Sequence, residues 1–307
     1  MPQVPGPTEN VPIRLKRILF ATDFSRTSAM ALPYAAAFAR HFGSSIYVTH
    51  VIPPEDYAHI QPDQLETTLH QMKEDAKQQI AALLASSHFR DIPFQVILDH
   101  GDVMTRVSAL VDKHSIDLIV AGSHGRHGVQ KLLSPSVEEA IAGAAACPAL
   151  LVGPTAAIEP EAEVHLSRIL YATDFSRQSR RAMDYAYALA EAYAAKLLVM
   201  HVAENILKEP LANRMTADAF IRMRLLESDL PEKVQGVEPE FLVALGMPEE
   251  RILQAAKQRE IQLIVVGVPG TTHPGLSSHL PGPLAWNLAS HSLCPLLAIR
   301  SGAQQKK

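Results

Sequence analysis

Two stretches of the sequence carry residue types that could bind a polar ligand. Asp23 follows one short apolar run, and the loop Gly122–Gly125 (GSHG) follows another. A ten-residue polar loop separates Gly125 from a new helical pattern that begins at Ser136. Glycines let a backbone approach a ligand closely, and the first N–H groups of a helix attract anions. The second stretch therefore predicts a phosphate-binding loop, and a carboxylate such as Asp23 would accept hydrogen bonds from a base or a ribose.

The sequence does not predict a catalytic centre. It contains neither a GxSxG nucleophile motif nor a GxxxxGK[ST] phosphate loop, and no GxGxxG follows the first apolar run. His124 and His127 lie in a loop without a second pair of ligands nearby, so we expect no metal site. We expect a binding protein, with at most slow hydrolysis of a bound nucleotide.

Composition excludes several classes of protein. The chain has 307 residues, 47% hydrophobic and 20% charged, which favours two globular domains. A net charge of −4 argues against nucleic-acid binding. No apolar run is long enough to span a membrane, and prolines replace the apolar segment that a signal peptide would need. We therefore expect a cytoplasmic protein with two reduced, buried cysteines, Cys147 and Cys294.

The chain contains a long internal repeat. Arg17–Arg26 (RILFATDFSR) recurs 151 residues later as Arg168–Arg177 (RILYATDFSR), and SIDLIVAG (115–122) is matched by EIQLIVVG (260–267). A period of this length indicates a duplicated domain. We expect a disordered arm (1–13), a first domain (14–153), a linker (154–165) and a second domain (166–301).

Each copy alternates short apolar runs with amphipathic helical patterns. In the first copy we expect strands at 17–21, 45–51, 94–98, 117–121 and 149–152, with helices at 29–41, 62–87, 102–114 and 136–146. In the second we expect strands near 168–172, 196–202, 238–244, 261–266 and 296–300. Pro33 predicts a kink or a later start of the first helix. The pattern predicts an α/β fold with two repeated, doubly wound, parallel five-stranded sheets of order 3-2-1-4-5, a Rossmann-like arrangement.

The expected topology places the candidate residues together. A doubly wound sheet binds its ligand beyond the carboxyl ends of the strands, where the winding reverses. In the order 3-2-1-4-5 this point lies between the first and fourth strands. Asp23 ends the first strand and Gly122 ends the fourth, so both would flank one crevice.

On the basis of these residues, both copies resemble the universal stress protein family, over residues 14–153 and 166–300. Nucleotide-binding members carry Gly-x2-Gly-x9-Gly-(Ser/Thr) after the fourth strand and an Asp after the first. The resemblance implies ATP, with Mg²⁺ as an accompanying ion, as the ligand of the first copy. The implied contacts are Asp23, Val51, Gly122, His124, Gly125, Ser136 and Val137.

The two copies depart from this motif to different extents. Pro135 replaces the third glycine of the first copy, which removes one N–H donor and costs about 1 kcal/mol or more of affinity. The second copy offers a weaker set: Asp174, Val202, Gly267, Gly270 and Gly282. Its loop is rich in proline, and Pro283 takes the Ser/Thr position. We expect the first copy to bind nucleotide and the second to bind weakly or not at all.

The resemblance also implies how the copies associate. Family members pair through their last strands, so 149–152 would lie beside 296–299 as a pseudo-dimer within one chain. The sequence leaves open whether the chain also forms a homodimer or binds another protein. It does not identify the stress signal.

Alternative interpretations remain for the same residues. Asp23 could cap the following helix, and Ser136 with Glu139 forms a capping box that needs no ligand. A scaffold or carrier of an apolar ligand is the alternative function, motivated by Pro135, Pro283 and the Met-rich segment 207–230. A slow ATPase is a third.

Overall fold

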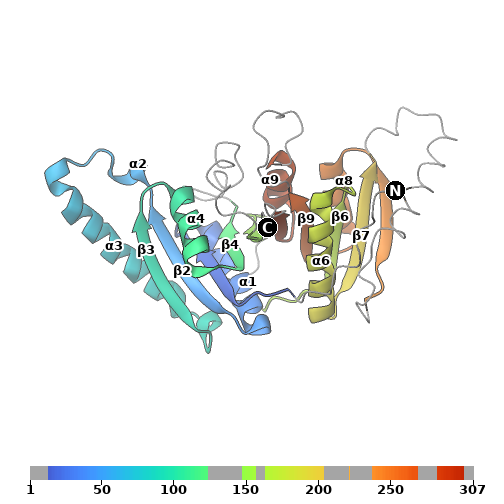
Figure 1. The fold of residues 1–307 in the computed structure, drawn as a ribbon, viewed down its shortest axis with the longest axis horizontal. Helices are drawn as coiled ribbons and strands as arrows, with labels where there is room; N and C mark the ends of the chain where they lie inside the picture. The colour runs from blue at the N-terminus through green and yellow to red at the C-terminus, as the bar shows by residue number, and fades with distance from the viewer. Residues whose placement is uncertain are drawn as a thin grey trace, which may run out of the picture.

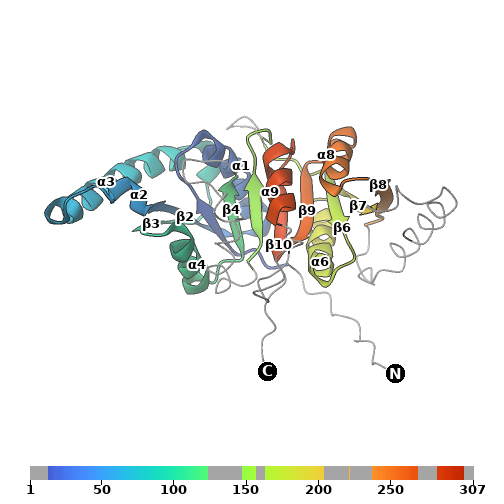
Figure 2. The same cartoon turned by 90° about the horizontal axis from the view of Figure 1, so that it is seen from above.

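The protein forms one continuous sheet of ten strands. The computed structural model describes residues 13–123, 147–156, 163–203, 221, 237–268 and 282–300. The strand order is β3-β2-β1-β4-β5-β10-β9-β6-β7-β8, and Figures 1 and 2 show the strands in one row with β3 and β8 at its ends. Each half is parallel and has the order 3-2-1-4-5, which confirms the predicted fold.

The described residues of the first half form five strands and four α-helices. The strands are β1 (Arg17–Ala21), β2 (Ser45–Ile52), β3 (Phe94–His100), β4 (Leu118–Gly122) and β5 (Ala149–Val152). The helices are α1 (Arg26–Phe42), α2 (Pro54–Tyr57), α3 (Pro62–Leu84) and α4 (Val103–His114), with a 3-10 turn at Ser87–Phe89. The helix expected at 136–146 lies outside the described residues.

The second half repeats the first. Its strands are β6 (Arg168–Thr173), β7 (Lys196–Ala203), β8 (Glu240–Leu245), β9 (Leu263–Val268) and β10 (Leu296–Arg300). Its described helices are α6 (Arg177–Ala192), α8 (Pro248–Gln258) and α9 (Gly282–His291).

The two halves join through their last strands. β10 pairs antiparallel with β5, with Leu296 opposite Leu151, Leu297 opposite Leu150 and Ala298 opposite Ala149. The predicted pseudo-dimer within one chain is therefore confirmed. The backbone of Gly153 lies so close to α9 that an added Cβ would approach the Ala289 carbonyl oxygen to 1.9 Å, which a side chain could not do.

The core extends across this junction without a break. One apolar cluster contains buried residues of α1, α3 and α6 together with strand residues from both halves. On the opposite face, α4 covers the first half and α8 and α9 cover the second. An aromatic contact joins α1 to α6, where the ring of Tyr193 stacks on His41 at 4.1 Å and lies 5.9 Å from Phe38. The two halves therefore share apolar surface as well as a strand pair.

α1 begins earlier than Pro33 predicted. Ser25 caps it by accepting a hydrogen bond from the Ser28 N–H at 3.2 Å, and Gly43 ends it in the left-handed conformation at φ 60°. Proline inside a helix removes one backbone bond and costs about 3 kcal/mol. The expected later start is wrong because the cap and the buried alanine-rich face on both sides of Pro33 stabilise the full length.

Two of the other differences from the prediction concern α3 and α2. α3 ends at Leu84, three residues before the predicted end at Ser87, where the 3-10 turn begins. The short helix α2 was not predicted, and Pro54 stands at its first position. Proline is compatible with the first position of a helix, where its missing N–H would have no intrahelical partner.

Candidate functional site

A tight turn at the carboxyl end of β1 positions Asp23. The Asp23 carboxylate accepts a hydrogen bond from the Ser25 N–H at 3.0 Å, and the Thr22 hydroxyl accepts one from the Phe24 N–H at 3.1 Å. These bonds hold Phe24 at φ 60°, a left-handed conformation that a bulky residue rarely adopts. The sequence Thr-Asp-Phe-Ser thus builds its own turn through short polar side chains.

The second copy builds the same turn. Asp174 accepts from the Ser176 N–H at 2.9 Å, Thr173 accepts from the Phe175 N–H at 3.0 Å, and Phe175 also has φ 60°. Strained backbone that persists at equivalent positions is held there by its surroundings and is common at binding sites. The turn is therefore a property of the repeated unit.

A histidine from the neighbouring strand supports each turn. His50 Nδ1 lies 2.9 Å from the Thr22 carbonyl oxygen, and His201 Nδ1 lies 2.8 Å from that of Thr173. Since a carbonyl oxygen only accepts, Nδ1 carries the proton in both rings. The rings also pack on Phe24 and Phe175, with centroids 4.4 and 4.5 Å apart. These histidines position the turn.

The strand order places the predicted switch point between β1 and β4. β1 pairs in parallel with β2 on one side and β4 on the other, with Ala21 opposite Thr49 and Ala121. This register brings Asp23, Val51 and Gly122 to the same edge of the sheet. His124, Gly125, Ser136 and Val137 lie outside the described residues, as does Pro135.

Gly122 has a packing role that needs no ligand. A Cβ added to it would lie 2.7 Å from the Ser28 backbone nitrogen and 2.7 Å from the Thr27 carbonyl carbon. β4 therefore ends directly against the first turn of α1, and only glycine fits without displacing the helix. The next residue, Ser123, is fully buried and donates its N–H to the Val152 carbonyl at 2.8 Å. The glycine at position 122 is consequently not, by itself, evidence for a phosphate-binding site.

In the second copy the equivalent edge holds Asp174, Val202 and Gly267. Thr173 pairs with His201, and Ala172 pairs with Val266, so these three residues lie at one end of their strands. Gly282 begins α9, and Gly270 lies outside the described residues.

The two carboxylates have different local partners. In the second copy, the Ser179 hydroxyl donates to Asp174 Oδ1. Burial disfavours the charged form of Asp174, yet the hydrogen bonds from Ser176 and Ser179 outweigh it and hold the pKa of this carboxyl below its ordinary value. Ser28, at the same repeat position in the first copy, donates to the Ser25 carbonyl at 3.0 Å and lies 3.0 Å from the Thr22 hydroxyl.

Two arginines at this edge were not predicted from the sequence. Arg106 and Arg251 fold back over Gly101 and Gly246, whose φ values are 122° and 135°. An added Cβ at either glycine would meet the arginine Nε at 3.0 or 2.9 Å. The signal was present in the repeat, because glycine is followed five residues later by arginine in both copies.

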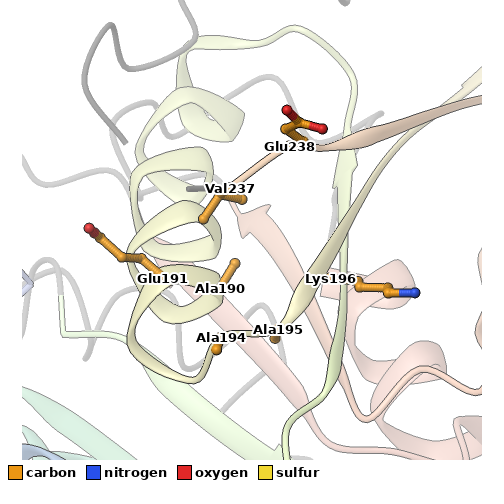
Figure 3. Close-up of a pocket in the computed structure, with 7 residues that line it drawn as sticks. All are labelled: Ala190, Glu191, Ala194, Ala195, Lys196, Val237 and Glu238. Atoms are coloured by element: carbon orange, nitrogen blue, oxygen red, sulfur yellow. The ribbon is translucent and has the colours of Figure 1, made fainter. Parts of the chain in front are cut away.

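A separate cleft of about 370 Å³ lies at the opposite edge of the second half. It is lined by Ala190, Glu191, Ala194, Ala195, Lys196, Val237 and Glu238, at the end of α6 and the amino ends of β7 and β8. Figure 3 shows that the charged side chains of Glu191, Lys196 and Glu238 point away from one another. Because no polar groups converge there, this cleft is a poor candidate for the nucleotide site.

The cysteines and the described polar clusters offer no further chemistry. Both cysteines are free; Cys294 is buried as expected, whereas Cys147 is only partly buried. Desolvation raises the pKa of Cys147 to about 12 and that of Cys294 to about 11, which leaves little thiolate at neutral pH. Within the described ranges, no group of three His, Cys, Asp or Glu side chains could hold a metal ion. In the same residues, no helix has the length and apolar character to cross a membrane.

Comparison with known proteins identifies the class. The sequence pattern of the Universal stress protein family matches residues 14–153 and 165–300, so the chain belongs to this family and carries its domain twice. The chain is similar to Universal stress protein YxiE of Bacillus subtilis, with 28% identity over 151 residues, which are 44% of this chain and 99% of that protein. It is also 34% identical over 142 residues to Universal stress protein A homolog 1 of Coxiella burnetii, covering 45% and 95% of the two chains.

A solved structure reproduces the double fold. A universal stress protein from Archaeoglobus fulgidus superimposes with a TM-score of 0.68 over 94% of this chain and 100% of its own, at 21% sequence identity. The similarity shows that both chains share the arrangement of two domains.

Proposed function

We propose that this universal stress protein binds ATP in the crevice between β1 and β4, and that occupancy of this site serves as a signal or as stabilisation in the cytoplasm. The supporting observation is the prebuilt turn that fixes Asp23 at the switch point of the first half, level with Val51 and Gly122. A site whose polar group is already positioned loses little entropy when a ligand binds.

The described residues suit the base and sugar end of a nucleotide. The Asp23 carboxylate would accept a hydrogen bond from the adenine amino group or a ribose hydroxyl, and backbone groups at Val51 would face the base. The loop beyond Gly122, with His124, Gly125, Ser136 and Val137, would hold the phosphates through N–H groups. Mg²⁺ would then be held by phosphate oxygens and water. Pro135 removes one donor, so we expect moderate affinity.

The second copy should bind more weakly. The Oδ1 atom of Asp174 already accepts hydrogen bonds from the Ser176 N–H and the Ser179 hydroxyl, which leaves fewer acceptor sites on this carboxylate for a ligand. The proline-rich loop that follows Gly267 provides fewer N–H groups than its counterpart in the first copy.

Titration calorimetry with ATP and Mg²⁺ tests the proposal with two matched variants. Asp23→Asn keeps an oxygen that can accept the Ser25 N–H, but it presents an amide in place of a carboxylate. Loss of one hydrogen bond to a charged group costs about 1.5–3 kcal/mol, so we expect Kd to rise roughly 10- to 150-fold. Asp174→Asn, at the equivalent position, should leave the tighter site unchanged.

The choice of variants follows from the packing. Substituting Gly122 would disturb α1 whether or not a ligand binds, so a loss of affinity there would be uninformative. The proposal is wrong if the parent protein shows no heat of binding at millimolar ATP, or if Asp174→Asn lowers the affinity and Asp23→Asn does not. Mass spectrometry of gently purified protein adds a second readout, because co-purified lipid instead of nucleotide would favour an apolar-ligand carrier.

A further inference from the structure

Within the part of the chain that the structure describes, β3 pairs only with β2 and forms one edge of the ten-stranded sheet. The strand order places it at the end of the row (Figure 1). Edge strands of monomeric proteins commonly carry lysine, proline or a bulge that prevents pairing. Phe94–His100 contains neither lysine nor proline. Of the four large apolar side chains that the described residues leave exposed, two lie here, Phe94 at 48% and Val96 at 37%.

The backbone pairing shows which groups of β3 face outward. The Ile46 N–H donates to the Pro93 carbonyl at 2.8 Å, and the Gly101 N–H donates to the Ile52 carbonyl at 2.9 Å. Odd-numbered residues of this segment therefore direct their backbone groups toward β2. Since successive residues alternate, the even-numbered residues direct theirs away from the sheet. These are Phe94, Val96, Leu98 and His100.

The order of residues along β3 is self-complementary. We infer that β3 is the interface for a second copy of this chain, which pairs antiparallel with it about a two-fold axis at Ile97. This register puts Phe94 opposite His100, Val96 opposite Leu98 and Gln95 opposite Asp99 of the other copy. The outward-facing even residues meet one another, which makes about eight inter-strand hydrogen bonds available. Val96 and Leu98 form apolar pairs, Phe94 meets the His100 ring, and no like charges are opposed.

The same type of contact already joins the two halves of the chain. β5 and β10 pair antiparallel at an edge, and the sheet passes through that junction without interruption. A β3–β3 contact would extend the sheet by the same operation at its open end. A two-fold axis gives a closed dimer, whereas pairing of β3 with β8 of another copy would be head-to-tail and would produce an open filament.

The long helix α3 would gain a partner in this dimer. Only Ala76 and Ile80 of its 23 residues are buried, although Leu65, Leu69 and Met72 form a half-buried apolar stripe. Figure 2 shows α3 extending past β3 at the end of the molecule. A two-fold axis perpendicular to the sheet keeps both α3 helices on one face, so each would lie against the other copy and cover the exposed part of this stripe.

Sedimentation equilibrium or light scattering of the full chain tests the interface. The parent protein should have a mass near twice 33.5 kDa at tens of micromolar. Val96→Lys should weaken dimerisation about tenfold or more, because the two-fold axis places the lysine in the contact twice. Gln95→Lys is the matched control: its backbone faces β2, and its lysine would lie opposite Asp99 of the other copy, so the dimer should persist.

Disulfide cross-linking tests the register. Ile97→Cys would place two thiols on the axis, in a pair whose Cα atoms lie about 4.5 Å apart, which is within disulfide range. Mild oxidation should give a covalent dimer. Cys147 and Cys294 should add little background, because their raised pKa values leave little thiolate at neutral pH.

These experiments distinguish the two-fold dimer from a monomer and from a head-to-tail assembly. A parent that is monomeric at all concentrations overturns the inference, as does a dimer that survives Val96→Lys and fails to cross-link through Ile97→Cys. A series of species larger than a dimer that Val243→Lys on β8 abolishes would show the head-to-tail contact instead. Unfolding curves of each variant establish that the monomer is folded, since Val96 and Gln95 are exposed.

Discussion

Substituting Gly122 by alanine should destabilise the protein in the absence of any ligand. The new methyl group would lie 2.7 Å from the Ser28 backbone nitrogen and 2.8 Å from the Thr27 carbonyl oxygen. Real Cβ atoms do not approach backbone atoms so closely, so either β4 or the start of α1 must move. The first turn of α1 is fixed by the Ser25 cap and by buried Ser28, which leaves little room for relaxation.

The expected loss of free energy of unfolding is that of overpacking a close-packed interior. Such insertions cost about 1–3 kcal/mol, which corresponds to a fall in Tm of roughly 2–12 °C for domains of this size. Urea unfolding followed by circular dichroism measures the free energy of unfolding, and calorimetry measures Tm. Gly43→Ala is a useful comparison, since its Cβ would meet only Lys16 Nζ at 3.9 Å and its cost would come from the left-handed φ of 60°.

One result would refute this reasoning. If Gly122→Ala is as stable as the parent and only its nucleotide affinity falls, the close approach to α1 does not determine the glycine, and its role belongs to the ligand. If stability falls as expected, loss of binding in Gly122 variants must be assigned at least partly to displacement of α1.

Three further predictions follow from other contacts. Ser179→Ala should raise the pKa of Asp174 toward its ordinary value, which an NMR titration measures. Because the pKa of Asp174 is lowered in the folded parent protein, the free energy of unfolding that Ser179 contributes should be fully present above about pH 4. This contribution should disappear as the pH falls through the pKa of Asp174 in the folded protein. Cys147 should react with a thiol reagent far more slowly in the native protein at pH 7.4 than in urea, and equal rates would contradict its burial. Leu297→Ala at the β5–β10 junction should cost about 2–5 kcal/mol and lower the stability of both halves together, whereas two separate calorimetric transitions would contradict a shared core.

The fold could be predicted because the same pattern of strands and helices occurs twice in the sequence. The 151-residue repeat and the alternation of strands and helices indicated two doubly wound sheets, and the resemblance to the universal stress protein family implied the β5–β10 junction. The turn at Asp23 was also predictable in outline, since Asp and Ser after a strand commonly form turns and caps.

Other features depend on contacts between distant residues and left little local signal. The start of α1 depends on burial around Pro33, which outweighs its helix-breaking tendency. The packing of Gly122 against Thr27 and Ser28 involves residues almost a hundred positions apart. A glycine after a strand predicts a close approach but does not show whether a ligand or a helix occupies the space.

The shared location of three candidate residues was predictable from the topology. Topology alone brings Asp23, Val51 and Gly122 to one edge, because the carboxyl ends of parallel strands coincide there. The different partners of Ser28 and Ser179, identical residues at equivalent positions, could not be read from the sequence. They depend on side-chain orientations set by the surrounding turn.

The central claim is that the first half binds ATP beside Asp23. A crystal structure grown with ATP and Mg²⁺ tests it most directly. We expect density for the adenine and ribose at the carboxyl ends of β1 and β2, within hydrogen-bonding distance of Asp23, with the equivalent edge beside Asp174 weakly occupied or empty. Density at the cleft near Lys196, or no nucleotide at either edge at saturating ATP, would contradict the account.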